Sequence, residues 1–159
     1  MLIRRASTKD LPFIQSCHRQ STRDDRFHGR SSRLGPFMPQ VEKDALINDA
    51  ETKGKYTTLM ATNRQAAPLG FGRVYHRARD NASTLHKLFV ASAARKRGVA
   101  TGLMNAFKRS ASQAGSDKLV VTISSKELLP FYKGQGFKVH STKKREGKSD
   151  LIRMECALR

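Results

Sequence analysis

One stretch of the sequence, residues 88–104, constrains the fold more than any other. The short apolar run Leu88-Phe89-Val90 leads through small residues into the basic turn Arg95-Lys96-Arg97-Gly98. An amphipathic segment begins at that turn and continues to about Ala114. The pattern predicts a strand, a turn and a helix, and the first backbone N–H groups of a helix have no partner within it. The helix dipole adds partial positive charge there, so the turn is suited to a phosphate or another anion.

The charge balance also favours an anionic partner. The 159 residues carry 31 Lys and Arg against 13 Asp and Glu, a formal net charge of +18. A field of that size favours nucleic acid, an anionic membrane or a phosphate-rich cofactor, and does not choose among them. The length fits one domain, residues 1–159, with a core of its own.

Two further observations predict where the protein resides. The N-terminus has too few apolar residues for a signal peptide, and no run approaches the ~20 apolar residues of a membrane span. Cys17 and Cys156 have no metal or redox spacing, so we expect both to be reduced. We therefore expect a cytoplasmic protein with no membrane partner.

Hydrophobic periodicity and turn residues predict a mixed α/β fold. The unit over 84–123 is expected to be parallel, with a right-handed crossover. Gly70 and Gly72 lie inside an expected strand and indicate a bulge or a close backbone approach. Residues 21–40 are polar, broken by Gly and Pro, and read as a long loop. Strands are expected over 2–6, 56–62, 69–75, 84–90, 118–124, 137–141 and 150–158, and helices from the N-cap Thr8, from Val41, over 98–114 and over 127–134.

Two segments resemble motifs of the GNAT superfamily of N-acyltransferases. Arg95-Lys96-Arg97-Gly98-Val99-Ala100 is similar to the family's acyl-CoA pyrophosphate motif, (Gln/Arg)-x-x-Gly-x-(Gly/Ala). Phe131-Tyr132-Lys133-Gly134-Gln135-Gly136-Phe137 resembles its later Phe-Tyr-x-x-x-Gly-Phe segment. Their order and spacing match the family, and the resemblance covers nearly the whole chain. It implies an α/β (α+β) fold with a mixed, mostly antiparallel sheet, a parallel central strand pair and flanking helices.

The resemblance implies an acyltransferase that uses acetyl-CoA as cosubstrate and no metal. Backbone N–H groups from Arg97 to Thr101 would hold the pyrophosphate. The pantetheine arm would lie along the strand edge at 88–90, in a gap between the strands at 84–90 and 118–124. Ser125 stands where the family often has Asn, and Lys96 where it often has Gly. The implied cofactor-binding residues are Leu88, Phe89, Val90, Arg95, Lys96, Arg97, Gly98, Val99, Ala100, Thr101, Ser125 and Tyr132.

Two residues are candidates for proton transfer. Tyr132 matches the tyrosine that the family often uses as general acid toward the departing thiolate, and its alternative role is packing in the core. An amine acceptor must lose a proton, so a base that titrates near neutrality would suit. His86 is the candidate base, on a strand face expected to be shared with Thr84, Leu88 and Val90. Its alternative role is structural, and Thr84 offers no carboxylate.

The acceptor is not identified by the sequence. In the family, the acceptor pocket is usually built by the regions that correspond to 21–40 and 141–150, which are strongly basic here. A cationic polyamine or aminoglycoside would be repelled there, whereas an acidic amine, an acidic protein tail or aminoacyl-tRNA would be attracted. The remaining histidines show no metal-ligand spacing.

Two alternatives stay open beside the N-acetyltransferase. The first is a catalytically inactive GNAT-like domain that binds RNA or DNA through its basic surface, and the second is an acyl-CoA-binding regulatory module. The sequence also leaves open the acyl-chain length and whether the chain forms a homodimer.

Overall fold

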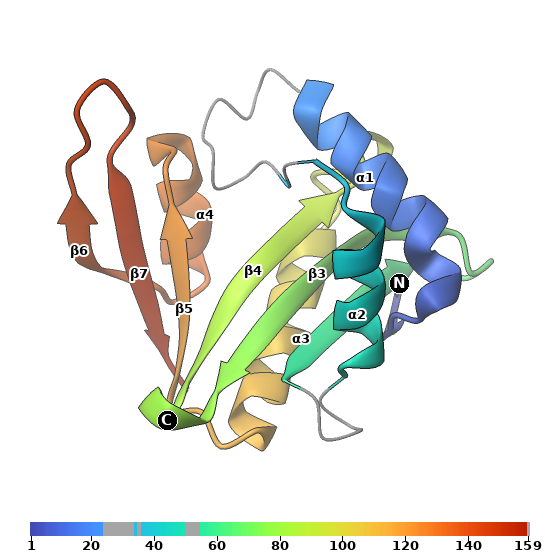
Figure 1. Cartoon of the computed structure of the whole chain (residues 1–159), viewed down its shortest axis with the longest axis horizontal. Coiled ribbons are helices and arrows are strands. Elements are labelled where there is room, and N and C mark those ends of the chain that lie inside the picture. Colours follow the sequence, from blue (N-terminus) through green and yellow to red (C-terminus); the bar gives the residue numbers. More distant parts are fainter. Residues whose placement is uncertain (24–33, 35, 50–54, 159) are drawn as a thin grey trace.

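The computed structural model describes residues 1–23, 34, 36–49 and 55–158. Its strands form one seven-stranded sheet in the order β1-β2-β3-β4-β5-β7-β6 (Figure 1). All neighbouring pairs are antiparallel except β4 and β5, which are parallel. This confirms the expected fold class. The strands are β1 (Leu2–Arg5), β2 (Tyr56–Thr62), β3 (Pro68–Arg77), β4 (Ala82–Val90), β5 (Lys118–Ile123), β6 (Lys138–Lys143) and β7 (Leu151–Ala157); the helices are α1 (Leu11–Arg23), α2 (Pro39–Ile47), α3 (Val99–Gln113) and α4 (Leu129–Gly134).

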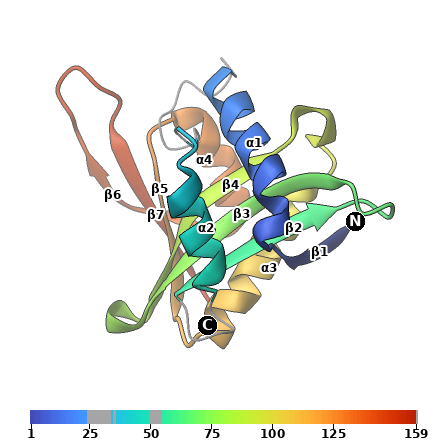
Figure 2. The same cartoon turned by 45° about the vertical axis from the view of Figure 1, so that its right-hand side comes forward.

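Helices cover both faces of the sheet, α1 and α2 on one and α3 on the other (Figures 1 and 2). The α3 face holds the larger buried cluster, which includes Leu103, Phe107 and Met154. The α1 face holds a smaller one around Ile14, Met60 and Phe71. Cys17 and Cys156 are buried, unpaired thiols in different clusters. None of the helices in the described residues has the length and apolarity needed to cross a membrane.

Helix α3 follows directly from its sequence pattern. Val99, Leu103, Phe107 and Ala111 recur at helical spacing, and each is at most 3% exposed. Gly115 follows the helix with φ of 88°, a left-handed conformation that favours glycine and ends the helix.

Three predictions about local structure need correction. Thr8 is not an N-cap: the helical region begins one residue earlier, because the carboxylate of Asp10 accepts a bond from the N–H of Ser7 and a bidentate pair from Arg4. Strands β3 and β4 are longer than the expected 69–75 and 84–90, since β3 continues to Arg77 and β4 begins at Ala82. Of the expected loop 21–40, residues 21–23 belong to α1 and 39–40 to α2, while 24–33 and 35 lie outside the described residues.

Strands β4 and β5 separate after a short paired region. Ala82, Ser83 and Thr84 pair with residues 118–120, and no pairing between the two strands continues beyond that point. Figure 1 shows the strands diverging toward their carboxyl ends. The expected gap is therefore present, but it begins after Thr84 rather than along the whole of both strands.

A bulge in β4 changes which residues share a face. Arg73 pairs with Lys87 but Val74 pairs with Leu85, so His86 is the extra residue. Leu88 and Val90 pack against the α3 cluster, whereas His86 stacks on Tyr75 with ring centroids 5.7 Å apart. The expectation that His86 shares a face with Leu88 and Val90 is wrong, because the bulge interrupts the alternation of side chains.

Gly72 confirms the expected close approach, and its substitution tests it. A Cβ at Gly72 would lie 2.6 Å from Phe107 Cε2 and 2.7 Å from the carbonyl oxygen of Lys87. We expect Gly72→Ala to lower the free energy of unfolding by about 1–3 kcal/mol, as overpacked sites do. Urea unfolding followed by circular dichroism measures the change.

Gly134→Ala is the matched control, since a Cβ at Gly134 meets no atom within 4 Å. This variant should keep or slightly raise stability, because alanine favours a helix more than glycine does. Equal stability of Gly72→Ala and the native protein would contradict the packing described here.

Candidate functional site

A cavity of about 210 Å³ opens between the diverging strands β4 and β5. The start of α3 borders it on one side and α4 on another. Most of its wall is apolar, and its polar side chains are few. It is lined by Leu85, His86, Lys87, Leu88, Phe89, Val90, Arg95, Ala100, Val121, Thr122, Leu128, Phe131 and Tyr132.

The N-terminus of α3 supplies hydrogen-bond donors at the edge of this cavity. Gly98 is the N-cap, with φ of 80° and ψ of 10°, and its carbonyl accepts the first helical bond from Gly102 at 2.9 Å. The N–H groups of Val99, Ala100 and Thr101 precede that bond and have no partner inside the helix. Together with the helix dipole they give this end of the helix the donors and partial positive charge that suit an anion; the anion site itself stays a prediction.

The basic turn is shaped by a side-chain contact of Arg95 and by the backbone conformation of Lys96. Arg95 Nε donates to the carbonyl of Val90 at 2.9 Å, and its guanidinium lies 5.3 Å from the centroid of the Phe89 ring. Arg95 therefore fastens the turn to the end of β4. Lys96 has φ of 61°, the left-handed conformation in which glycine is favoured. Lys96 thus occupies a position whose backbone suits the glycine that the family often has.

Tyr132 lies at the inner wall of the cavity. It is 6% exposed, and its ring packs edge-on against Phe131 and Phe137 with centroids 5.1 and 5.4 Å away. Burial raises the pKa of Tyr132, so its hydroxyl stays protonated at neutral pH. The residue is packed in the core and is also among the residues that line the cavity.

His86 lines the same cavity from the β4 bulge. Its ring is stacked on Tyr75 and meets Tyr56 edge-on at 6.1 Å. His86 is an exposed residue of β4, but its neighbours remove part of the ring from water, and this desolvation, followed by the positive charges of Arg73 and Lys87, lowers the pKa of His86. The imidazole is therefore neutral near pH 7 and has a nitrogen available to accept a proton.

The structure brings most of the predicted site residues together. Leu88, Phe89, Val90, Arg95 and Ala100 line the cavity, as do His86 and Tyr132. Lys96, Arg97, Gly98 and Thr101 lie on the exposed turn and first helical residues beside it, whereas Val99 is buried in the core. Ser125 lines a separate polar depression with Lys126 and Lys148 instead.

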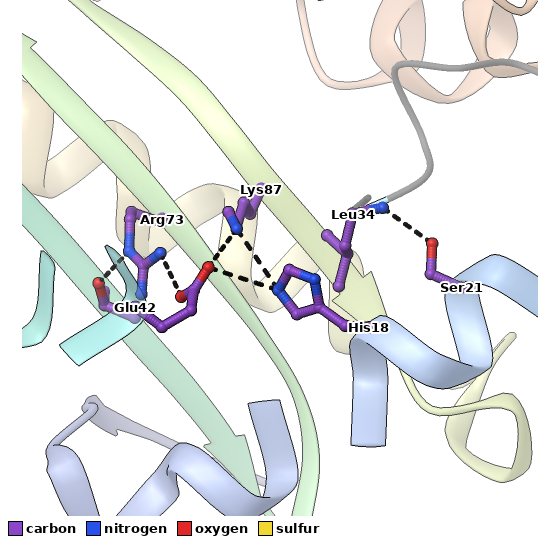
Figure 3. Close-up of polar contacts among 7 residues, drawn as sticks. His18, Ser21, Leu34, Glu42, Arg73 and Lys87 are labelled. Carbon is purple, nitrogen blue, oxygen red and sulfur yellow. Dashed lines mark hydrogen bonds and ion pairs between the residues drawn. The ribbon is translucent and has the colours of Figure 1, made fainter. Parts of the chain in front are cut away.

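A buried ionic cluster connects α1 and α2 to β3 and β4 (Figure 3). One of its members, Lys87, also lines the cavity. The carboxylate of Glu42, on α2, accepts bonds from Arg73 Nη1 at 2.6 Å and from Lys87 Nζ. His18 Nε2, on α1, lies 3.4 Å from Glu42 Oε1, and Arg73 Nε donates to Thr58 Oγ1 at 2.8 Å. Glu42, Arg73 and His18 are each at most 2% exposed.

The electrostatics of this cluster favour an ionised Glu42. Burial would raise the pKa of this carboxyl, but His18, Arg73 and Lys87 outweigh burial and hold the pKa well below its usual range. Burial lowers the pKa of Lys87, and the Glu42 carboxylate opposes that change. The ionised carboxylate of Glu42 therefore links α1 and α2 to the central strands β3 and β4.

The sequence interpretation missed this cluster. The available signal was a charged residue within an apolar strand pattern: Arg73 follows Phe71 and Gly72, and Lys87 stands between Leu85 and Phe89. A buried charge is costly unless it is paired, so buried cations at these two positions predict a carboxylate partner from elsewhere in the chain. Within the described residues, no group of three or more His, Cys, Asp or Glu side chains could hold a metal ion.

Comparison with known proteins agrees with these observations. A family model described as "Acetyltransferase (GNAT) domain" matches residues 30–158. Curated proteins give no significant match to the sequence.

Solved structures share the fold at low sequence identity. Ribosomal-protein-alanine N-acetyltransferase from Brucella melitensis is 20% identical with a TM-score of 0.79, over 99% of both chains. A phosphinothricin acetyltransferase from Sinorhizobium meliloti in complex with AcCoA is 14% identical with a TM-score of 0.79, over 98% of this chain and 87% of the other. The PaiA N-acetyltransferase from Thermoplasma acidophilum in complex with coenzyme A is 18% identical with a TM-score of 0.78, over 98% of both.

The strain at Lys96 is testable by substitution. We expect Lys96→Gly to raise the free energy of unfolding by up to about 1 kcal/mol, because glycine adopts the left-handed conformation without the Cβ penalty. Arg97→Gly, at a neighbour without positive φ, should lower stability by about 0.5–1 kcal/mol through the unfolded state. Thermal and urea unfolding of both variants give the comparison, and a loss of stability in Lys96→Gly would refute the strain.

We expect substitution of Glu42 to lower the stability of the protein by an amount that depends on pH. Glu42→Gln should lower the free energy of unfolding by about 3 kcal/mol or more at pH 7, since two buried cations then lack their counter-charge. The pKa of Glu42 is lower in the folded protein than in the unfolded chain. The native protein should therefore be more stable than Glu42→Gln at pH values above the pKa of the unfolded chain, and this difference in the free energy of unfolding should shrink as the pH falls below that pKa.

Unfolding of native protein and Glu42→Gln from pH 3 to 8 measures this difference. Glu146→Gln, at an exposed position of the β6–β7 turn, is the control and should match the native protein throughout. A gap between Glu42→Gln and native protein that stayed constant down to pH 3 would contradict the ionised cluster.

Proposed function

Because the chain belongs to the GNAT family of acetyltransferases, we propose that it transfers an acetyl group from acetyl-CoA to a primary amine. The observation that carries the proposal is the cavity between β4 and β5, which extends from the N-terminus of α3 to Tyr132. The amine nitrogen forms a bond to the thioester carbonyl carbon and the carbon–sulfur bond breaks. The amine loses a proton, and CoA leaves as a thiolate that takes one up.

The residues present fit acetyl-CoA. The N–H groups of Val99, Ala100 and Thr101 face a diphosphate as fixed donors, and the turn adds the cations Lys96 and Arg97. Beyond Thr84, β4 has an edge that β5 does not pair, which suits the amide groups of a pantetheine arm. Acetyl-CoA supplies the acetyl group as a reactive thioester.

Tyr132 acts on the leaving group in this proposal. Its hydroxyl is protonated at neutral pH and the residue lines the cavity, so in this scheme it donates a hydrogen bond to the departing sulfur. The raised pKa of Tyr132 favours a donated hydrogen bond over a complete proton transfer, because a thiolate with a pKa of about 8.5 is the weaker base.

His86 is the candidate general base. It is the neutral imidazole at the cavity wall, and within the part of the chain that the structure describes no carboxylate side chain lines the cavity. Thr84 has a hydroxyl group and no carboxylate, so it does not serve as a general base here. His86 accepts the amine proton directly or through water in this scheme.

The acceptor class is a small molecule, a protein or an aminoacyl-tRNA, and we place the reaction in the cytoplasm. Two structural neighbours are named as ribosomal-protein-alanine N-acetyltransferases, from Brucella melitensis and Escherichia coli. That likeness supports a protein amine among the candidates. The reduced, separately buried Cys17 and Cys156 support an intracellular location.

Ligand-induced stabilisation tests the function. Acetyl-CoA at about 100 times its Kd should stabilise the protein by about 2.7 kcal/mol, seen as a higher Tm. Ala100→Glu should abolish this effect, because it places a negative charge at the helix N-terminus beside the cavity. Asn105→Glu, exposed in the middle of α3, is the matched control and should respond like the native protein.

The same assay with RNA and DNA at moderate salt separates the nucleic-acid alternative. Stabilisation by nucleic acid without any by acetyl-CoA would reject the proposed transferase. Release of CoA with a panel of amines then distinguishes catalysis from a binding module.

A pH–rate profile tests His86. We expect His86→Ala to lower kcat by about 100-fold and to remove the acidic limb of the native profile. His140→Ala, at an exposed position on β6, should leave both unchanged. An unaltered acidic limb in His86→Ala would assign the proton to water or to the acceptor's own environment.

A further inference from the structure

The described residues that line the cavity include positively charged side chains and no acidic ones. This excess of positive charge indicates the class of acceptor. Lys87 and Arg95 are the cations among the lining residues, and His86 lies beside Lys87. Arg95 is fastened to the end of β4, which leaves Lys87 as the cation on the strand wall near His86.

The geometry of Lys87 leaves part of its ammonium group available. Nζ donates to Glu42 Oε1 and lies 3.4 Å from His18 Nε2. An ammonium group has three N–H donors, so one is not used by Glu42 or His18. Lys87 is also among the residues that line the cavity. The side chain is 20% exposed, compared with 2% for Glu42 behind it.

The cluster behind Lys87 does not neutralise its charge. The single carboxylate of Glu42 is shared between Lys87 and Arg73. Arg73 is 2% exposed, and its Nη2 is buried without a hydrogen-bond partner among the described residues. Within the described residues, two buried or half-buried cations thus share one anion, and an anionic group in the cavity would offset the excess.

We propose that Lys87 binds a carboxylate of the acceptor, carried by the same molecule as the amine that is acetylated. This inference rests on the proposed acetyl transfer and names its acceptor class. The bond is a charge-assisted one, held in place because Glu42 and His18 restrain the ammonium group. Lys87 is a substrate-binding residue in this scheme, and Glu42 positions it.

The same charge acts on the reacting amine. A cation at the cavity wall disfavours a second positive charge nearby, so it favours the neutral, nucleophilic form of the amine. It also rejects acceptors whose remaining groups are cationic, such as polyamines. The remaining single donor of Lys87 suits one carboxylate oxygen better than a phosphate group, which takes several donors.

Matched pairs of amines that differ in one carboxylate test the inference. The pairs are glutamate and glutamine, aspartate and asparagine, and alanine and alaninamide, assayed by CoA release at saturating acetyl-CoA. For at least one pair, the acid should have a kcat/KM about 10- to 100-fold higher than the amide, as expected for one charge-assisted hydrogen bond. The pair that responds shows whether an α- or a side-chain carboxylate is bound.

Variants of Lys87 identify the residue responsible. Lys87→Met should bring the acid-to-amide ratio close to one, and Lys87→Arg, which keeps the charge, should retain a preference for the acid. Lys138→Met, at an exposed position on β6, should leave the ratio and both rates unchanged. The Tm of each variant shows that the fold is retained. A native ratio near one for every pair, or an unchanged ratio in Lys87→Met, would overturn the inference.

A binding measurement keeps this inference separate from the proposed function. The same pairs are titrated calorimetrically into native and Lys87→Met protein saturated with CoA. Acid binding that is lost in Lys87→Met supports the role of Lys87 even if no probe is acetylated, and that outcome would count against the transferase alone. Equal binding of acid and amide, or no binding of either, overturns the role of Lys87.

Discussion

The separation of β4 from β5 is the constraint on which the candidate site depends. Both strands lie in the middle of the sheet, yet they pair only at 82–84 and 118–120. Beyond that region the backbone of β4 keeps a free edge inside the fold, and a cavity opens beside it. The basic turn follows β4 directly, so the N-terminus of α3 lies at the end of the same edge. One departure from regular pairing thus places an anion site, an extended edge and a cavity together.

The Glu42 cluster is the second organising interaction. It joins α1 and α2 to β3 and β4 through a charge that would be costly to bury alone. Replacing such a cluster with apolar residues is often neutral or stabilising, so stability by itself is a poor reason for its presence. Lys87 belongs to this cluster and also lines the cavity, so the cluster contacts the candidate site. The bulge at His86 adds to this, because it brings two consecutive basic residues to one wall.

Most of the fold follows from local patterns. The apolar stripe from Val99 to Ala111 predicted α3, and the β-branched run at 56–62 matched β2. Some site predictions needed only adjacent residues in the sequence, whereas others depended on how neighbouring strands pair. Leu88, Arg95 and Ala100 belong to one contiguous segment, and all three line the cavity, whereas the expected face of His86 was wrong because a bulge depends on the neighbouring strand. Ser125 was expected at the cofactor, but it lines a different depression.

The anion site could be derived from the linear chain because a strand, a turn and a helix start are all set by adjacent residues. The Phe-Tyr segment and the basic turn together were also enough for the family resemblance. The balance of charge at the cavity could not be derived that way. It depends on Glu42, Arg73 and Lys87, which come from a helix and two strands and meet only in the folded protein. Burial then decides how strongly those charges interact, and burial is a property of the packed structure.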